Sequence, residues 1–179
     1  MSIEDLVKED SSFNETKFIA NVDNTYIMML SAIITNNLKK VDHKIGDEVY
    51  NELKVKLDDL NSKGYHQMYD EANVKSTSIV RIDKTDTKYI IRVRLVSRYM
   101  DYIVDKDYNY VSGNNSNRVE IVNFLTFEKN IDTKEMGLVK KCPTCGASID
   151  YNSNGECSYC HNIFNTEDYD YVLTKIEMG

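Results

Sequence analysis

Two CxxC pairs near the end of the chain limit its fold more than any other sequence feature. Cys142 and Cys145 form the first pair, Cys157 and Cys160 form the second, and the sequence has no other cysteine. Eleven residues separate the pairs. Each pair forms a tight turn whose backbone N–H groups point at the sulfurs, and the loop between them brings the pairs together. The spacing predicts a zinc ribbon in which all four cysteines bind one Zn²⁺ ion.

Other uses of these cysteines fit the sequence less well. Disulfide bonds need an oxidising compartment, but residues 1–10 are acidic and have no apolar core of a signal peptide. A redox CxxC usually stands alone after a strand. His161 is an alternative ligand beside Cys160, and with four thiolates present we expect it at the surface. Four thiolates also leave no open position for a substrate, so the expected role of the metal is structural.

The charge of the chain argues against nucleic acid as a partner. It has 22 Lys and Arg against 29 Asp and Glu, a net charge of −7. Residues 138–165, the expected ribbon, carry as many acidic as basic side chains. Phosphate binding normally needs a basic stripe. No apolar run is long enough to span a membrane. We expect a cytoplasmic protein, with a peripheral position at the inner face of a membrane as the alternative.

Two helices are predicted in the first third of the chain. Residues 1–12 are acidic with little to bury, and we expect a tail there. An amphipathic helix is predicted from Phe13 to Lys40, and a second from Gly46 to Ser62 with Gly64 as its stop. The apolar residues of the first helix are Phe18, Val22, Tyr26, Met29, Leu30, Ile33, Ile34 and Leu38.

After Gly64 the apolar period changes to two, which predicts strands. We expect strands at 74–83, 88–105 and 119–127, with turns at 84–87 and 105–109 and a polar loop at 112–117. In the second strand Arg92, Arg94 and Arg98 occupy the polar face, where we expect pairing with Glu120 and Asp101. Two helices followed by an antiparallel meander predict an α+β fold, with a curved sheet around a long helix.

One more strand is predicted at 169–176. It is an edge strand of the ribbon in one interpretation. We favour a return to the main sheet beside the strand that ends at Phe127. The expected segments are a tail at 1–12, a main domain at 13–137, the ribbon at 138–165 and the returning strand at 166–179.

The chain resembles a known family in the order of its segments. The matching segments are FIANVDNTYIMMLSAIITNNLKKV, GDEVYNELKVKLDDL, DYIVDKDYNYVSGN, VEIVNFLTFEK, CPTCGASIDYNSNGECSYC and DYDYVLTKI. They are similar to bacterial proteins whose domain resembles the C-terminal domain of the forty-four kilodalton subunit of the mitochondrial inner-membrane import translocase. The resemblance extends roughly from Phe13 to Ile176.

This resemblance implies a cone similar to cystatin and to nuclear transport factor two. In such a cone, helices pack in the concavity of a bent antiparallel sheet beside an apolar pocket. The mitochondrial relative is a membrane-associated docking platform for the import motor. The family has no catalytic motif to transfer, so only the four cysteines can be matched residue by residue.

Three classes of function follow. The favoured class is a non-catalytic binding or scaffold protein that docks a protein, peptide or lipid-like ligand through the pocket or sheet, with a link to protein transport. A peripheral membrane protein is the first alternative, with Lys39, Lys40 and Lys44 as its small basic patch. A pocket enzyme of the isomerase or dehydratase type is the second. Its candidate groups are His43, His66, Arg92, Arg94, Tyr99, Asp101 and Tyr102. Ligand-binding residues, the partner and the oligomeric state are unknown at this stage.

Overall fold

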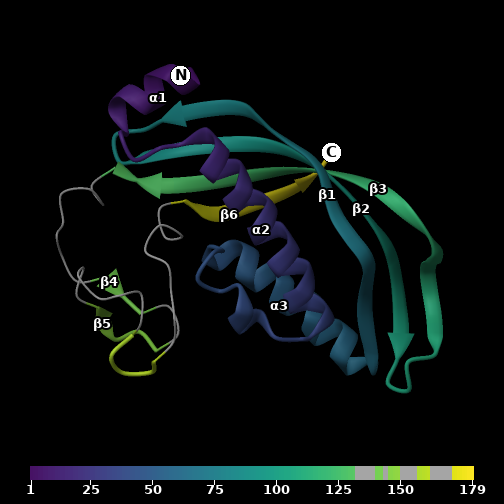
Figure 1. Cartoon of the computed structure of the whole chain (residues 1–179). Helices are drawn as coiled ribbons and strands as arrows, with labels where there is room; N and C mark the ends of the chain where they lie inside the picture. Colours follow the sequence, from purple (N-terminus) through teal and green to yellow (C-terminus); the bar gives the residue numbers. More distant parts are fainter. Residues whose placement is uncertain (132–139, 143–144, 150–156, 162–170) are drawn as a thin grey trace.

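The computed structural model describes residues 1–131, 140–142, 145–149, 157–161 and 171–179. Its elements are α1 (Ile3–Glu9), α2 (Glu15–Ile34), the 3₁₀ turn η1 (Leu38–Lys40), α3 (Asp47–Ser62), β1 (Tyr65–Lys84), β2 (Lys88–Asp105), β3 (Tyr110–Asn130), β4 (Lys140–Lys141), β5 (Ser148–Ile149) and β6 (Val172–Met178). Figure 1 shows α2 and α3 on the concave side of a curved sheet, so the expected α+β cone is confirmed.

The expectation of an acidic tail at 1–12 is wrong. Ser2 and Asp5 form a capping box that starts α1, and Leu6 is fully buried in the main core. Glu9 at the end of α1 pairs with Lys84 of β1 at 2.6 Å. A seven-residue helix gains little stability by itself. Helix α1 is therefore stabilised by the packing of Leu6 and by the capping box, although its acidic composition suggested a tail.

Helix α2 begins with Asn14, whose side-chain oxygen accepts a 2.9 Å hydrogen bond from the backbone N–H of Lys17. The predicted apolar stripe is buried, including Phe18, Val22 and Tyr26. The helix ends at Ile34, however, and not near Lys40. Asn36 adopts φ +50°, a left-handed conformation that asparagine tolerates better than most residues and that interrupts the helix.

Helix α3 agrees closely with its prediction. Val49, Leu53, Leu57 and Leu60 are its buried residues. Gly64 follows with φ +70°, a conformation that costs glycine little. The two predicted turns are also present, because β1 ends at Lys84, β2 runs from Lys88 to Asp105, and β3 begins at Tyr110.

The main sheet is antiparallel with strand order β1-β2-β3-β6. On its concave side Ile91 of β2 lies between Ile82 of β1 and Phe127 of β3. The predicted loop at 112–117 is wrong, because these residues belong to β3. Gly113 allows this: it pairs with Tyr102 at φ +101°, and a Cβ there would lie 2.5 Å from the carbonyl oxygen of Asp101.

A polar contact joins α2 to the concave face of the sheet. The hydroxyl of Tyr26 lies 3.0 Å from Ser97 Oγ of β2 and accepts a 3.1 Å hydrogen bond from the amide of Asn123 on β3. All three residues are buried. Because buried polar groups are costly unless they are paired, these bonds favour one position of α2 on the sheet.

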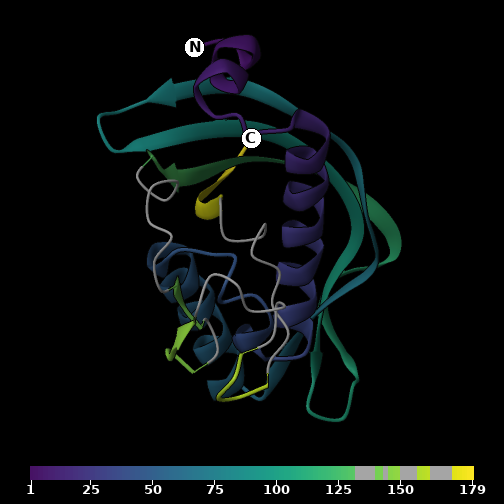
Figure 2. The ribbon, with the colours of Figure 1, turned by 60° about the vertical axis from the view of Figure 1, so that its left-hand side comes forward.

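Strand β6 lies beside β3, as the sequence suggested, with Leu173 opposite Phe127 and Ile176 opposite Leu125. Its other side meets the segment before α3: the N–H of Leu173 donates to the carbonyl of Lys44 at 2.9 Å, and the N–H of Gly46 donates to the carbonyl of Leu173 at 2.7 Å. The chain therefore leaves the sheet after Asn130 and returns at Val172. The segment boundaries proposed from the sequence stay predictions. Figure 2 shows the returning strand β6 in yellow.

Candidate metal centre and pocket

The four cysteines lie together, with all Sγ atoms within 4.8 Å of one another. Cys142 Sγ is 3.6 Å from Cys160 Sγ, and Cys145 Sγ is 3.7 Å from Cys157 Sγ. All four are free thiols. A tetrahedral site with metal–sulfur bonds of roughly 2.3 Å places its sulfurs about 3.8 Å apart. The four side chains therefore fit a single four-coordinate metal ion.

The two CxxC turns end in the same way. The N–H of Gly146 donates to the carbonyl of Cys142, and the N–H of His161 donates to the carbonyl of Cys157, both at 2.8 Å. Both donors are left-handed, with φ +73° at Gly146 and +56° at His161. His161 thus occupies in the second turn the position that glycine has in the first. Its side chain is exposed.

A short hairpin supports the first turn. Strand β4 pairs with β5, and the N–H of Cys142 donates to the carbonyl of Ala147 at 2.6 Å. Cys142 and Cys157 are buried in a small apolar cluster of their own with Ala147. Gly155, which comes just before the second CxxC pair, lies outside the described residues.

Backbone hydrogen bonds favour the thiolate form of one cysteine. The backbone N–H groups of Cys160 and Tyr159 lower the pKa of Cys157 to about 6. A thiolate is the form of cysteine that binds metal ions. The second CxxC turn thus favours the metal-binding form of Cys157 even without a metal ion.

A His161→Gly variant should bind metal with unchanged stoichiometry. Glycine adopts the left-handed conformation of this position at less cost than histidine, so the second turn should be slightly more stable. Elemental analysis of the purified variant checks this result. A loss of bound metal would instead make His161 a ligand.

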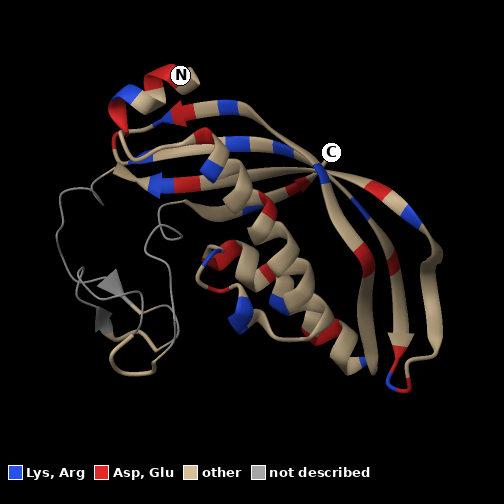
Figure 3. Cartoon of the chain, viewed as in Figure 1, with Lys and Arg blue, Asp and Glu red and all other residues tan. Residues whose placement is uncertain are grey.

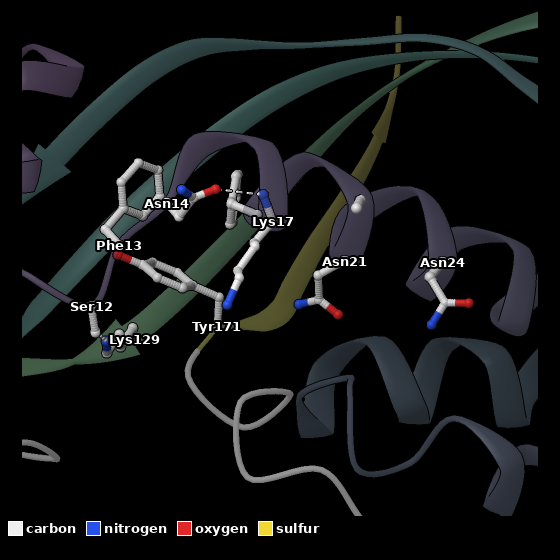
Figure 4. A pocket seen from close by; sticks show the side chains of 10 residues that line it. Ser12, Phe13, Asn14, Lys17, Asn21, Asn24, Lys129 and Tyr171 are labelled. Atoms are coloured by element: carbon white, nitrogen blue, oxygen red, sulfur yellow. Dashed lines mark hydrogen bonds between the residues drawn. The ribbon is translucent and has the colours of Figure 1, made fainter.

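A pocket of about 440 Å³ opens beside the start of α2 (Figure 4). Its lining comes from the segment before α2, from α2, from the end of β3 and from the residue before β6. An aromatic cluster forms one wall: the Phe18 ring centroid is 5.7 Å from that of Phe13 and 5.2 Å from that of Tyr171. The described lining residues are Ser12, Phe13, Asn14, Lys17, Phe18, Ala20, Asn21, Asn24, Lys129 and Tyr171.

A buried ion pair borders this pocket. Lys129 Nζ donates to Asp10 Oδ2 at 2.7 Å and to Ser12 Oγ at 2.9 Å. The side chain of Lys129 is 3% exposed and that of Asp10 is 0% exposed. The pair connects the end of α1 to β3, and the Lys129 ammonium also lies 5.5 Å from the centre of the Tyr171 ring. One wall of the pocket is thus fixed by charge as well as by packing.

A second buried lysine corrects an expectation. Lys44 was predicted to belong to a surface basic patch, but the residue is only 3% exposed. Its ammonium donates to Asn21 Oδ1 at 2.9 Å. Lys44 thereby orients an asparagine of the pocket. Of the expected patch, only Lys39 and Lys40 are exposed.

The candidate groups for catalysis are scattered. His43 lies 3.7 Å from Asp42, and His66 stacks on Tyr108. Asp101 accepts a 2.8 Å hydrogen bond from Gln67. None of these groups lines the pocket.

The two candidate tyrosines are held in separate contacts as well. Tyr99 packs against Tyr69, and burial raises the pKa of its hydroxyl well above the usual range. Tyr102 donates a hydrogen bond to Asp70, which raises the pKa of Tyr102. Neither tyrosine is among the described pocket residues.

The expected pairing of the three arginines is confirmed only in part: Arg98 and Arg94 act on Glu120 through their charge, after the closer Lys75, but form no salt bridge with it. Glu120 pairs with Lys75 at 2.7 Å, and Asp101 bonds with Gln67. Arg92 pairs instead with Glu177 of β6 at 3.1 Å and lies over the Phe124 ring. Arg92 could not be assigned this partner from the sequence, because Glu177 reaches it only after β6 has joined the sheet.

Comparison with known proteins agrees with this architecture. The sequence model of the family described as Tim44-like domain matches residues 1–137. The chain belongs to this family. The match includes α1, which the sequence resemblance had left out, and ends before the cysteines of the Tim44-like chain.

Other comparisons are more distant. A solved structure titled intermembrane space region of chloroplast protein ARC6 matches with 7% sequence identity and a TM-score of 0.45, covering 93% of this chain and 96% of that one. No curated protein matches the chain. Among the described residues of this Tim44-like protein, no helix has both the length and the apolar character needed to cross a membrane.

Proposed function

We propose that this Tim44-like protein is a non-catalytic binding module that docks a protein or peptide segment in the pocket beside α2. The composition of the pocket carries this proposal: aromatic rings form one side, and side-chain amides and ammonium groups line another. A volume of about 440 Å³ is in the usual range for ligand sites. Membership of the Tim44-like family supports a link to protein transport.

A peptide suits this lining for a chemical reason. Asn21 and Asn24 carry both a donor and an acceptor, as each peptide group of a bound segment does. The rings of Phe13 and Tyr171 can contact an apolar side chain of that segment. The described lining residues include no His, Asp, Glu or Cys. Of the groups there that can act in acid–base catalysis, Lys17, Lys129 and Tyr171, the ammonium of Lys129 is already bonded to Asp10 and Ser12. This composition favours binding over an isomerase or dehydratase reaction.

We propose Zn²⁺ as the ion of the cysteine site, in a structural role. A tetrahedral set of four thiolates suits zinc or iron. Zinc is the usual ion of closed four-cysteine sites in ribbons. Metal analysis and the visible spectrum of the purified protein separate the two ions, because a zinc protein is colourless and an iron–thiolate protein is coloured.

Filling the pocket should abolish peptide binding. Ala20 is an exposed residue of α2 that lines the pocket, and Ala20→Trp would place a large ring there without disturbing the core. The probe is a library of blocked tetrapeptides, followed by nuclear magnetic resonance of the Asn21 and Asn24 side-chain amides. Members of the library should shift both signals in the wild type and neither in the variant.

Ser31→Trp provides the matched control. Ser31 is also exposed on α2 but is not part of the described lining, and it lies about 16 Å further along the helix than Ala20. This variant should therefore bind as the wild type does. Bound peptides should be recovered unchanged in mass, because the proposal assigns no chemistry to the pocket. If no library member shifts the two signals, or if phospholipid vesicles shift them and peptides do not, the peptide proposal is wrong.

A further inference from the structure

The convex face of the main sheet carries a group of cationic side chains. Helices α2 and α3 both lie on the concave side, and Figure 3 shows blue segments along the strands. On β2, Arg92, Arg94 and Arg98 alternate with the buried residues of the concave face. Their cross-strand partners on β3 are Thr126, Phe124 and Glu120.

Two of these arginines make no ion pair within the described residues. Arg92 is paired with Glu177, whereas neither Arg94 nor Arg98 forms a salt bridge or a side-chain hydrogen bond with the part of the chain that the structure describes. Arg94 is exposed and Arg98 is partly exposed. Glu120, directly opposite Arg98, is bonded to Lys75, and its pKa is lowered by Lys75 first and then, at longer range, by Arg98 and Arg94. The strand thus presents two guanidinium groups that can bind carboxylates.

The charge of this face is opposite to that of the whole chain. Arg94 and the side chains around it make up six cationic and three acidic groups, a surplus of three positive charges. The chain as a whole has a net charge of −7. The cationic residues are Lys75, Arg81, Arg92, Arg94, Arg98 and Lys175, and the acidic ones are Asp83, Glu120 and Glu177.

We infer that this convex face, here called the arginine face, docks an acidic, extended segment of a partner protein. Arg94 and Arg98 are four residues apart on one strand, so their Cα atoms lie roughly 13 Å apart. Two carboxylates four residues apart in an extended segment have the same spacing. Each can form a two-point hydrogen bond with a guanidinium group. Val96 is the residue of β2 between the two arginines on this face and is 4% exposed, so no charged side chain of β2 stands between them.

Discrete carboxylates fit this face better than a continuous polyanion does. Asp83, Glu120 and Glu177 stand among the cationic groups and would repel a nucleic acid backbone or an anionic bilayer at several points. A protein segment can place carboxylates at Arg94 and Arg98 and neutral residues elsewhere. The arginine face lies on the opposite side of the sheet from the pocket, so this proposal goes beyond the pocket proposal and can fail independently of it.

Fluorescence anisotropy tests the inference. The probe is a labelled peptide of about twelve residues with Glu at every fourth position and Thr and Ser between, a spacing that suits an extended segment. Its affinity for the full chain should fall with added salt. An Arg94→Glu, Arg98→Glu variant should bind about tenfold more weakly or worse. Arg94→Lys, Arg98→Lys keeps the charge but loses the two-point geometry, so a smaller loss is expected.

The controls define what would overturn the inference. Lys54→Glu, Lys63→Glu makes the same change in charge at exposed residues in α3 and directly after it, and should leave peptide binding unchanged. Unaltered melting of each variant shows that it folds. The inference is wrong if a peptide with Gln in place of Glu binds equally well, or if the Arg94→Glu, Arg98→Glu variant binds as the wild type does. It is also wrong if phosphatidylglycerol vesicles or an oligonucleotide bind and the Glu peptide does not.

Discussion

A Cys142→Ser, Cys145→Ser variant should retain almost no metal, whereas the wild type should carry about one zinc per chain. The variant keeps only the two thiolates of the second CxxC turn, because both sulfurs of the first turn have been replaced. Structural zinc supplies on the order of 10 kcal/mol to the folding of small metal domains. Residues 138–165 should therefore become sensitive to protease in the variant. Elemental analysis and limited proteolysis measure the two effects.

Tyr159→Ser provides the matched control for the cysteine variant. Tyr159 lies in the second CxxC turn and is 73% exposed, so its side chain should not matter for the metal. The control should keep its zinc and its resistance to protease. A full zinc load in the Cys142→Ser, Cys145→Ser variant would contradict the metal site.

Lys129→Ala should lower the free energy of unfolding by about 3–5 kcal/mol, because removing one partner of a buried ion pair leaves the other, the carboxylate of Asp10, without its counter-charge. Asp10 is fully buried, and without Lys129 its carboxylate would keep, within the described residues, only the hydrogen bonds from the N–H and hydroxyl of Ser12. The aromatic wall at Tyr171 would lose its cation as well. Chemical denaturation followed by circular dichroism measures the change.

Two further variants separate the buried charge from lost packing. Lys129→Met with Asp10→Asn removes both charges and keeps most of the volume, so the loss should be clearly smaller than for Lys129→Ala. Lys175→Ala breaks an exposed pair with Glu177, and a change of at most about 1 kcal/mol is expected. A loss below about 1 kcal/mol for Lys129→Ala would show that the pair contributes little to stability.

Periodic packing made much of the fold predictable. The buried stripe of α3 and the alternation of Ile91, Val93 and Leu95 on β2 each repeat a local spacing, and one face of each element meets the core. The turns at 84–87 and 105–109 were also predictable from the sequence, because they interrupt those repeats. Four cysteines in two pairs predicted the candidate metal site for a similar reason, because the spacing of the pairs brings the four thiols together.

The pocket residues follow no local repeat. Asp10 and Lys129 are 119 positions apart in the sequence, and they meet only after α1 has packed against the sheet. Asn21 and Lys44 are likewise brought together by the return of the chain before α3. An asparagine on a helix and a lysine in a loop look like surface residues when only neighbours in the sequence are considered. The sequence therefore did not predict these two contacts between distant residues.

Gly113 and Asn36 illustrate a related limit. A polar run around a glycine usually marks a loop, yet here Gly113 lets β3 approach β2 where a Cβ would collide. Asn36 ends α2 although Leu38 continues the apolar period four residues after Ile34. In both places one backbone angle decides the structure, and composition alone does not reveal it.

The insertion of the ribbon between β3 and β6 limits what metal loss can do to the rest of the fold. Residues 131–171 form a connection of 41 residues between two paired strands. A metal that joins Cys142 to Cys160 shortens the effective loop to about 24 residues, which lowers the entropic cost of closing it by only about 0.5 kcal/mol. The cone should therefore keep nearly its full stability without zinc, and a cell short of zinc would retain the pocket and the arginine face.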